Sequence, residues 1–170
     1  MEPLAPVDVL VLAGLLAVEP RESWTQAELA GLLRLSPAMI TRSIQRLCDA
    51  RLYDRGTRRV DRAAAAELLL HAVRLVFPAR VGGPARGVPT AHSAPPLRDQ
   101  LAADSAYVWP WEEGEVSGMA IEPLHPSVPA ARASLPEAYE LLALVDALRV
   151  GRARERALAA REIRSRLGVP

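Results

Sequence analysis

Four polar side chains at helical spacing form the most distinctive pattern in this sequence: Thr41, Arg42, Gln45 and Arg46. An arginine can hydrogen-bond the edge of a guanine, a glutamine the edge of an adenine, and a threonine either a base or the phosphate backbone. No acidic residue lies among them before Asp49, whereas an ordinary solvated helix face would carry charges of both signs. The pattern therefore favours contact with double-stranded DNA, and a plain charged surface is the alternative.

The helix that would carry these side chains is predicted from Pro37 to about Arg51. Ser36 is a good N-cap, and proline fits only the first turn of a helix. The opposite face of this helix is apolar and is expected to enter the core, at Ile40, Ile44, Leu47 and Cys48.

A shorter helix is predicted just before it. Thr25 stands three residues before Glu28, the spacing of a capping box, and Trp24 and Leu29 have the spacing of a hydrophobic staple. The apolar positions of this helix are Ala27, Ala30 and Leu33. A break of about three residues between two capped helices is typical of a helix-turn-helix.

Two short strands are predicted after the second helix, at 52–54 and 58–60, around a turn that contains Gly56. From Arg34 to Arg62 there are eight arginines and three acids, an excess of +5 in a chain whose net charge is +1. Positive charge is therefore concentrated here, as expected of a nucleic-acid-binding surface. The predicted DNA-binding residues are Ser36, Ala38, Thr41, Arg42, Gln45, Arg46, Arg55, Arg58 and Arg59.

This part of the chain resembles the MarR-type winged helix-turn-helix family. The resemblance covers roughly residues 7–77 and lies in Leu35-Ser36, Ile40-Thr41-Arg42, Ile44, Leu47 and Ala50-Arg51-Leu52-Tyr53. It implies a dimer that binds duplex DNA sequence-specifically, often as a repressor released by a small ligand or by oxidation. The chain departs from the family in having Arg51 where a glycine is usual, and in its shorter wing.

The predicted fold class is mainly α with small β elements. We expect a winged helix-turn-helix domain (1–77), a Pro/Gly-rich strap and β-hairpin (78–135), and a C-terminal helical segment (136–170). In the first domain, the helix Val7–Val18 is apolar on all sides after Asp8, which predicts burial on more than one side. A helix from Arg62 to Phe77 would follow the wing, with an apolar stripe at Leu68, Leu69, Ala72, Leu75 and Val76.

The middle segment begins with residues 80–97, which are rich in Gly and Pro and predict an extended strap. The hairpin would pair 107–111 with 116–121 and place Trp109 and Trp111 on one face. Such a pair can stack on bases, but from Arg98 to Leu148 there are two arginines and nine acids. We therefore expect this region to face away from DNA, with the tryptophans in the core or at a protein contact.

A homodimer is the expected assembly. The first helix has more apolar surface than one small domain can cover, and the C-terminal helix has a stripe at Leu141, Leu142, Val145 and Leu148. These surfaces are the predicted dimer contacts, although the strap 80–97 is an alternative cover for either.

No catalytic or metal-binding pattern is present, so neither an enzyme nor a cofactor is predicted. His71, His92 and His125 lack metal-ligand spacing to one another or to the single cysteine, Cys48. One cysteine also suits a reducing cytoplasm. The N-terminus has no basic segment typical of a signal peptide, and the apolar run 7–18 is too short to span a bilayer. A cytoplasmic protein without membrane contact is therefore expected.

Two functions follow from these patterns. The first is a sequence-specific transcriptional regulator, in particular a repressor. The alternative is an antitoxin-like or accessory protein of a bacterial defence or toxin–antitoxin pair, whose C-terminal half binds a partner protein. The arginine-rich helix favours the first function, and the long segment beyond the family resemblance favours the second.

Overall fold

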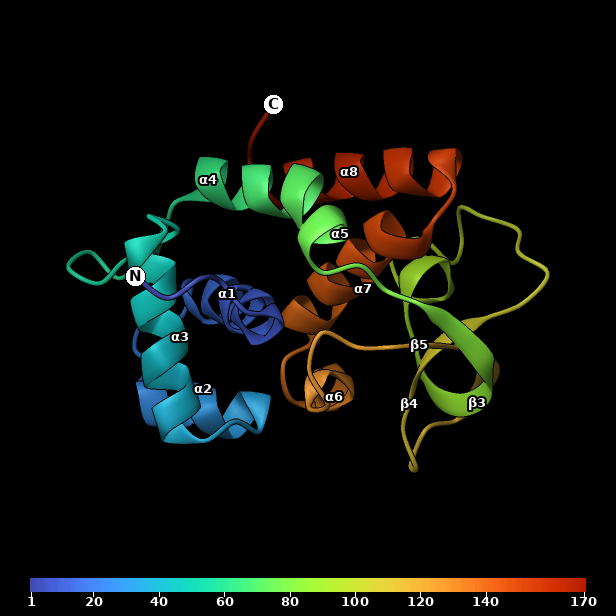
Figure 1. Ribbon diagram of the computed structural model, residues 1–170, viewed down its shortest axis with the longest axis horizontal. Coiled ribbons are helices and arrows are strands. Elements are labelled where there is room, and N and C mark those ends of the chain that lie inside the picture. Colours follow the sequence, from blue (N-terminus) through green and yellow to red (C-terminus); the bar gives the residue numbers. More distant parts are fainter.

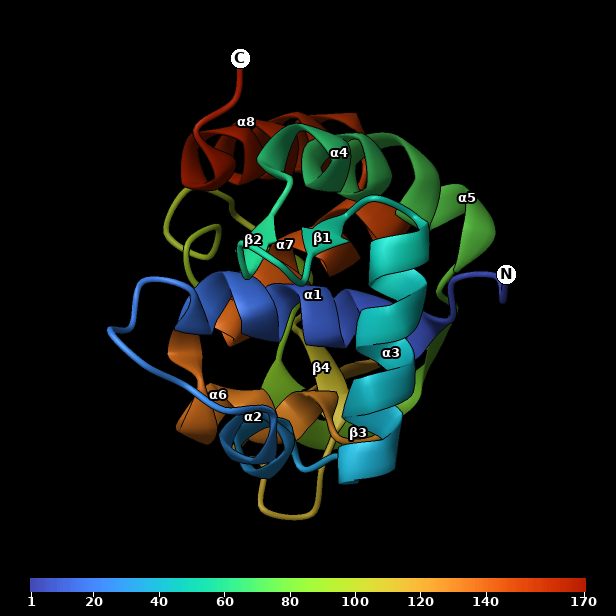
Figure 2. The same cartoon turned by 90° about the vertical axis from the view of Figure 1, so that its left-hand side faces the viewer.

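Helix α1 (Pro6–Val18) lies in the middle of the computed structural model, which describes residues 1–170 (Figures 1 and 2). It packs against α3 on one side and α7 on another. Its side chains from Val9 to Ala13, together with Leu15 and Val18, are at most 2% exposed. The prediction that this helix is buried on more than one side is confirmed.

Helices α2 (Gln26–Leu33) and α3 (Pro37–Asp49) are joined by a short turn. The Thr25 hydroxyl accepts the Glu28 N–H (3.1 Å), and the Glu28 carboxylate accepts the Thr25 N–H (2.6 Å), which is the predicted capping box. Arg34 ends α2 in the left-handed conformation, with φ of 51°. The buried face of α2 is Leu29, Ala30 and Leu33, so Ala27 is exposed rather than part of the apolar stripe.

Strands β1 (Tyr53–Asp54) and β2 (Arg59–Val60) form a small antiparallel ribbon after α3. The turn between them is held by Asp54, whose carboxylate accepts the Gly56 N–H and the Thr57 hydroxyl, both at 2.8 Å. The two strands and their tight turn agree with the predicted positions.

The next helix changes type along its length, which corrects the predicted apolar stripe. It begins as α4 (Arg62–Glu67), passes through the π-helical turn η1 (Leu68–Ala72), and ends as α5 (Val73–Val76). The wider π turn rotates the residues that follow it relative to a regular helix. Consequently Leu69 and Val73 are buried, whereas Leu75 and Val76 are 66% and 61% exposed.

The segment expected to be an extended strap is largely a strand, β3 (Val81–Pro89). It pairs antiparallel with both β4 (Tyr107–Pro110) and β5 (Val116–Ile121). Strands β4 and β5 pair parallel to each other, so they close a small three-stranded barrel and do not form the predicted hairpin. Gly87 permits the closure, because a Cβ there would lie 1.8 Å from the Trp109 carbonyl oxygen.

Helix α7 covers α1, and the remaining helices pack around α7 to complete the core. A short turn η2 (Ala91–Ser93) follows β3, and η3 (Val128–Ala130) and α6 (Ala131–Ser134) lead to α7 (Pro136–Val150) and α8 (Ala153–Leu167). Figures 1 and 2 show α8 beside α4 across the top of the molecule. The predicted stripe of α7 is buried, but α1 covers it within the chain. The two surfaces assigned to a dimer are therefore not free.

One buried carboxylate ties the barrel to α7. Asp146, 1% exposed, accepts hydrogen bonds from Thr90 (2.8 Å) and Trp109 (2.5 Å) and pairs with Arg149 (2.7 Å). Burial raises the pKa of Asp146 more than these partners lower it. Trp109 is itself 1% exposed and belongs to the core, one of the two predicted alternatives.

Candidate functional site

The exposed face of α3 lies at one end of the molecule, next to the β1–β2 turn (Figures 1 and 2). The helix buries Ile40, Ser43, Ile44 and Leu47, which leaves its opposite face to solvent. Cys48 is half-buried and packs against the core from its edge. The exposed side chains on α3 are those of Pro37, Ala38, Thr41, Arg42 and Gln45.

Short hydrogen bonds order most of this face. The Thr41 hydroxyl donates to the Pro37 carbonyl (3.1 Å), and the Gln45 amide donates to Asp49 (2.9 Å). The Ser36 hydroxyl accepts the Met39 N–H at 3.2 Å and therefore acts as the N-cap. Arg42 takes part in no ion pair, so its guanidinium is available to a ligand.

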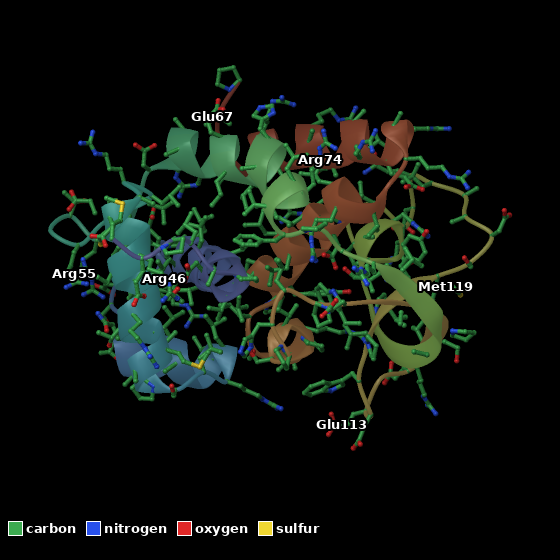
Figure 3. All side chains as sticks on the ribbon, in the orientation of Figure 1. Arg46, Arg55, Glu67, Arg74, Glu113 and Met119 are labelled. Atoms are coloured by element: carbon green, nitrogen blue, oxygen red, sulfur yellow. The ribbon has the colours of Figure 1, made fainter.

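The tip of the β1–β2 turn is connected to α3 through Arg55. Its guanidinium donates to the Gln45 side-chain carbonyl at 3.2 Å. Figure 3 shows Arg55 at the outermost edge of this end of the molecule. Arg55 and the exposed side chains of α3 therefore belong to one continuous surface.

Arg46 differs from the prediction, because its side chain turns inward. Its guanidinium binds Asp8 of α1 through Nε (2.8 Å) and a terminal nitrogen (2.7 Å), and only 13% of the side chain is exposed (Figure 3). Asp8 also accepts the Ser43 hydroxyl at 2.5 Å. The hydrogen bond to Asp8 raises the pKa of Arg46 despite partial burial. Arg46 thus holds α3 against α1, and its guanidinium is not directed at the exposed face predicted to contact bases.

Arg58 also has a structural contact that the sequence did not predict. It lies over the Trp24 ring, with its guanidinium carbon 4.3 Å from the ring centroid, and donates to the Trp24 carbonyl at 2.6 Å. The stack fixes the β1–β2 turn to the start of α2. This contact engages one terminal nitrogen of Arg58, which otherwise remains exposed.

Glu19 fixes the other side of the β1–β2 ribbon. Its side chain, 5% exposed, accepts the Val60 N–H (3.0 Å) and pairs with Arg62 (2.9 Å) and Arg59 (3.3 Å). Arg59 nevertheless remains 69% exposed, so it can still meet a phosphate. Burial alone would raise the pKa of Glu19, but these hydrogen bonds and charges outweigh it and lower the pKa.

A lowered pKa makes Glu19 a source of pH-dependent stability. The contribution is fully present above the unfolded pKa, about 4.3, and is lost as the pH falls through the lower folded pKa. We expect Glu19→Gln to be less stable than the wild type at pH 6, and the difference to shrink as the pH is lowered below about 4. Urea unfolding of both proteins across this range measures it, and a difference that stays constant would contradict the assignment.

A cavity of about 620 Å³ opens between the end of α3 and the β1–β2 ribbon. Its wall includes Arg51, which has no ion pair and which was absent from the predicted site. Arg51 has φ of 58°, the left-handed region that favours glycine. Its sequence position, two residues after the end of α3, was the one available indication that Arg51 lines this cavity.

No group of three or more histidine, cysteine or acidic side chains is placed to hold a metal ion. None of the helices has both the length and the apolar composition needed to cross a bilayer. No family model, no curated protein and no solved structure matches this chain.

Proposed function

We propose that this protein binds double-stranded DNA sequence-specifically and acts as a transcriptional repressor. The observation that carries the proposal is the exposed face of α3, where Thr41, Arg42 and Gln45 stand free of the core beside an arginine-bearing turn. Arginine and glutamine at helical spacing suit the base edges of the major groove. In this proposal α2, α3 and the β1–β2 ribbon act as a winged helix-turn-helix with a very short wing.

Local geometry supports the likeness to the MarR-type family. Arg51 occupies the position at which that family usually has glycine, and it adopts the left-handed conformation that glycine favours. The backbone therefore leaves α3 in the conformation that a glycine at this position would adopt. The arginine in addition places a positive charge at the base of the wing. We assign Arg51, Arg55 and Arg59 to phosphate contacts.

A second copy of the chain is part of the proposal. One helix offers few base contacts, and helix-turn-helix proteins gain affinity by placing two recognition helices about 34–36 Å apart along the duplex. Since α1 and α7 cover each other, another surface must pair. Leu75, Val76 and Val81 are the large hydrophobic side chains, besides Met1, that remain exposed, and we assign the dimer contact to them.

If Leu75 and Val76 form the dimer contact, acidic replacements at these positions should separate the two copies. Leu75→Glu combined with Val76→Glu should convert the protein to a monomer, because two carboxylates would be buried in the contact. Light scattering at micromolar concentration measures the mass of the wild type and the variant. A monomeric wild type would refute the dimer, and a dimeric variant would place the contact elsewhere.

Arg42 is expected to be the most important single side chain for DNA affinity. Arg42→Ala should weaken binding to a selected operator by roughly 10- to 100-fold and relax the base preference at one position. Arg154→Ala is the matched control, because Arg154 is exposed and without an ion pair but lies on α8. Fluorescence anisotropy compares the three proteins. Equal affinities for Arg42→Ala and wild type would remove α3 from the interface.

The alternative is an accessory or antitoxin-like protein in which the C-terminal half binds a different protein. The exposed apolar side chains Leu75, Val76 and Val81 lie just before the C-terminal half, and they would also suit a foreign partner that contacts it. Co-purification from the native host discriminates the two functions. A stoichiometric partner that is lost with the Leu75→Glu/Val76→Glu variant would support the alternative.

A further inference from the structure

A second cleft, of about 380 Å³, lies away from the exposed face of α3. The turn between α2 and α3, strand β3, the turn η3, helix α6 and the loop between β4 and β5 all line it. Its polar lining consists of Arg34, Arg132 and Glu113, around the half-buried ring of Trp111. Figure 3 shows Glu113 at the lower edge of the molecule, at the outer end of this loop, and Arg55 at the left edge.

The charged groups of this cleft lack partners within the chain. None of the ion pairs includes Arg34, Arg132 or Glu113. The Arg34 guanidinium carbon lies over the Trp111 ring, 5.9 Å from its centroid, compared with 4.3 Å in the closed stack of Arg58 on Trp24. Arg34 and Trp111 therefore face each other without making a tight contact.

Hydrogen bonds fix both walls of the cleft. The backbone N–H of Trp111 donates to the Arg86 carbonyl (3.1 Å), and the backbone N–H of Gly114 donates to the Trp111 carbonyl (3.0 Å). The Arg86 side chain donates through Nε to the Gly114 carbonyl (2.6 Å). On the other side, the Ser134 hydroxyl donates to the Leu32 carbonyl at 2.6 Å, which ties α6 to the end of α2. A ligand would therefore meet a largely preformed site, which reduces the entropy lost on binding.

We propose that this cleft binds a mononucleotide. The base stacks on Trp111, since an indole ring accepts the flat face of any base. The phosphate binds Arg34 and Arg132, because guanidinium groups form strong charge-assisted hydrogen bonds with phosphate oxygens. Glu113 accepts a hydroxyl of the sugar. The cleft volume lies at the lower end of the range of small-molecule sites.

The surrounding charge favours a free nucleotide over a nucleic-acid strand. Glu112, Glu113 and Glu115 lie in the loop beside Trp111, in a region with two arginines and nine acids. Two arginines can neutralise one phosphate, whereas the further phosphates of a strand would meet these carboxylates. The site is independent of the DNA-binding proposal, because no residue of the exposed α3 face lines it.

Titration of the full-length protein with the four ribonucleoside 5′-monophosphates tests this proposal. Isothermal calorimetry should detect at least one of them with a dissociation constant at or below about 1 mM. The chain has three tryptophans, so an ¹⁵N spectrum contains three indole N–H signals, and only that of Trp111 should move. The parent nucleoside and ribose 5-phosphate should each bind at least about tenfold more weakly, because each lacks one of the two contacts.

Two variants and a control complete the experiment. Trp111→Leu should abolish binding, Arg132→Gln should weaken it about tenfold, and Arg154→Gln should leave it unchanged. Circular dichroism checks that each variant is folded. If Trp111→Leu does not fold, Arg132→Gln provides the test instead, because Arg132 is exposed on a short helix. Failure of all four nucleotides to bind, unchanged affinity in Arg132→Gln, or tighter binding of a trinucleotide would each overturn the proposal.

Discussion

A chain truncated after Ser134 is expected to lose its cooperative fold, including the fold of residues 1–77. Helix α1 is the reason, because its apolar side chains are covered by α7 as well as by α2 and α3. Burying one such side chain contributes about 1.5–3 kcal/mol, whereas a whole domain is stable by about 5–15 kcal/mol. Exposing even a few leucines and valines of α1 would therefore cost as much free energy as the whole domain gains on folding.

Thermal unfolding followed by circular dichroism measures this effect. The full chain should melt in one transition, because a single hydrophobic cluster draws side chains from α1, the barrel and α8. The truncated chain should show no cooperative transition at all. A truncated protein that melts near the temperature of the full chain would instead establish residues 1–77 as an independent unit.

The second large effect is expected from Asp8→Ala, which should lower the free energy of unfolding by about 3–5 kcal/mol. Asp8 is 1% exposed and accepts hydrogen bonds from Ser43 and from two nitrogens of Arg46. Its removal leaves the Arg46 guanidinium, in a site that is largely closed to water, with only the exposed Glu2 as a carboxylate partner. Breaking one partner of a buried pair is costly for that reason.

Glu2→Gln provides the matched control, because Glu2 pairs with the same guanidinium at 3.2 Å but is 72% exposed. An exposed pair contributes less than about 1 kcal/mol, so this variant should unfold almost as the wild type does. Urea unfolding gives both values. Equal losses in the two variants would show that burial of Asp8 does not govern the strength of the pair.

The sequence predicted the helices and caps around α2 and α3 well, because each boundary depends on residues within a few positions. Thr25 with Glu28 and Ser36 with Met39 are contacts of this local kind. The amphipathic face of α3 follows the same short spacing. The burial of α1 was predictable too, because a helix that is apolar on all sides has no polar face that could be exposed to solvent.

Contacts between distant residues were not predictable in this way. Arg46 has the spacing of an exposed residue, yet its partner Asp8 lies 38 positions away. Arg58 and Trp24 are 34 positions apart. Strand β3 was missed because its glycines and prolines hide the alternation typical of a strand, and the π turn at Leu68–Ala72 has no recognisable sequence pattern. The candidate interface therefore differs from the predicted one at Arg46, which is engaged by Asp8, and at Arg51, which lines the cavity beside α3.

Selection of duplexes from a random library tests DNA binding most directly. The full-length protein, immobilised at near-physiological salt, is expected to enrich one sequence motif. The motif should consist of two inverted half-sites about 10 base pairs apart, centre to centre, as expected for two recognition helices on one face of the duplex. The protein with Thr41, Arg42 and Gln45 all replaced by alanine should enrich nothing. A library that stays random with the wild-type protein, or a motif that the triple variant enriches equally, would contradict sequence-specific binding through α3.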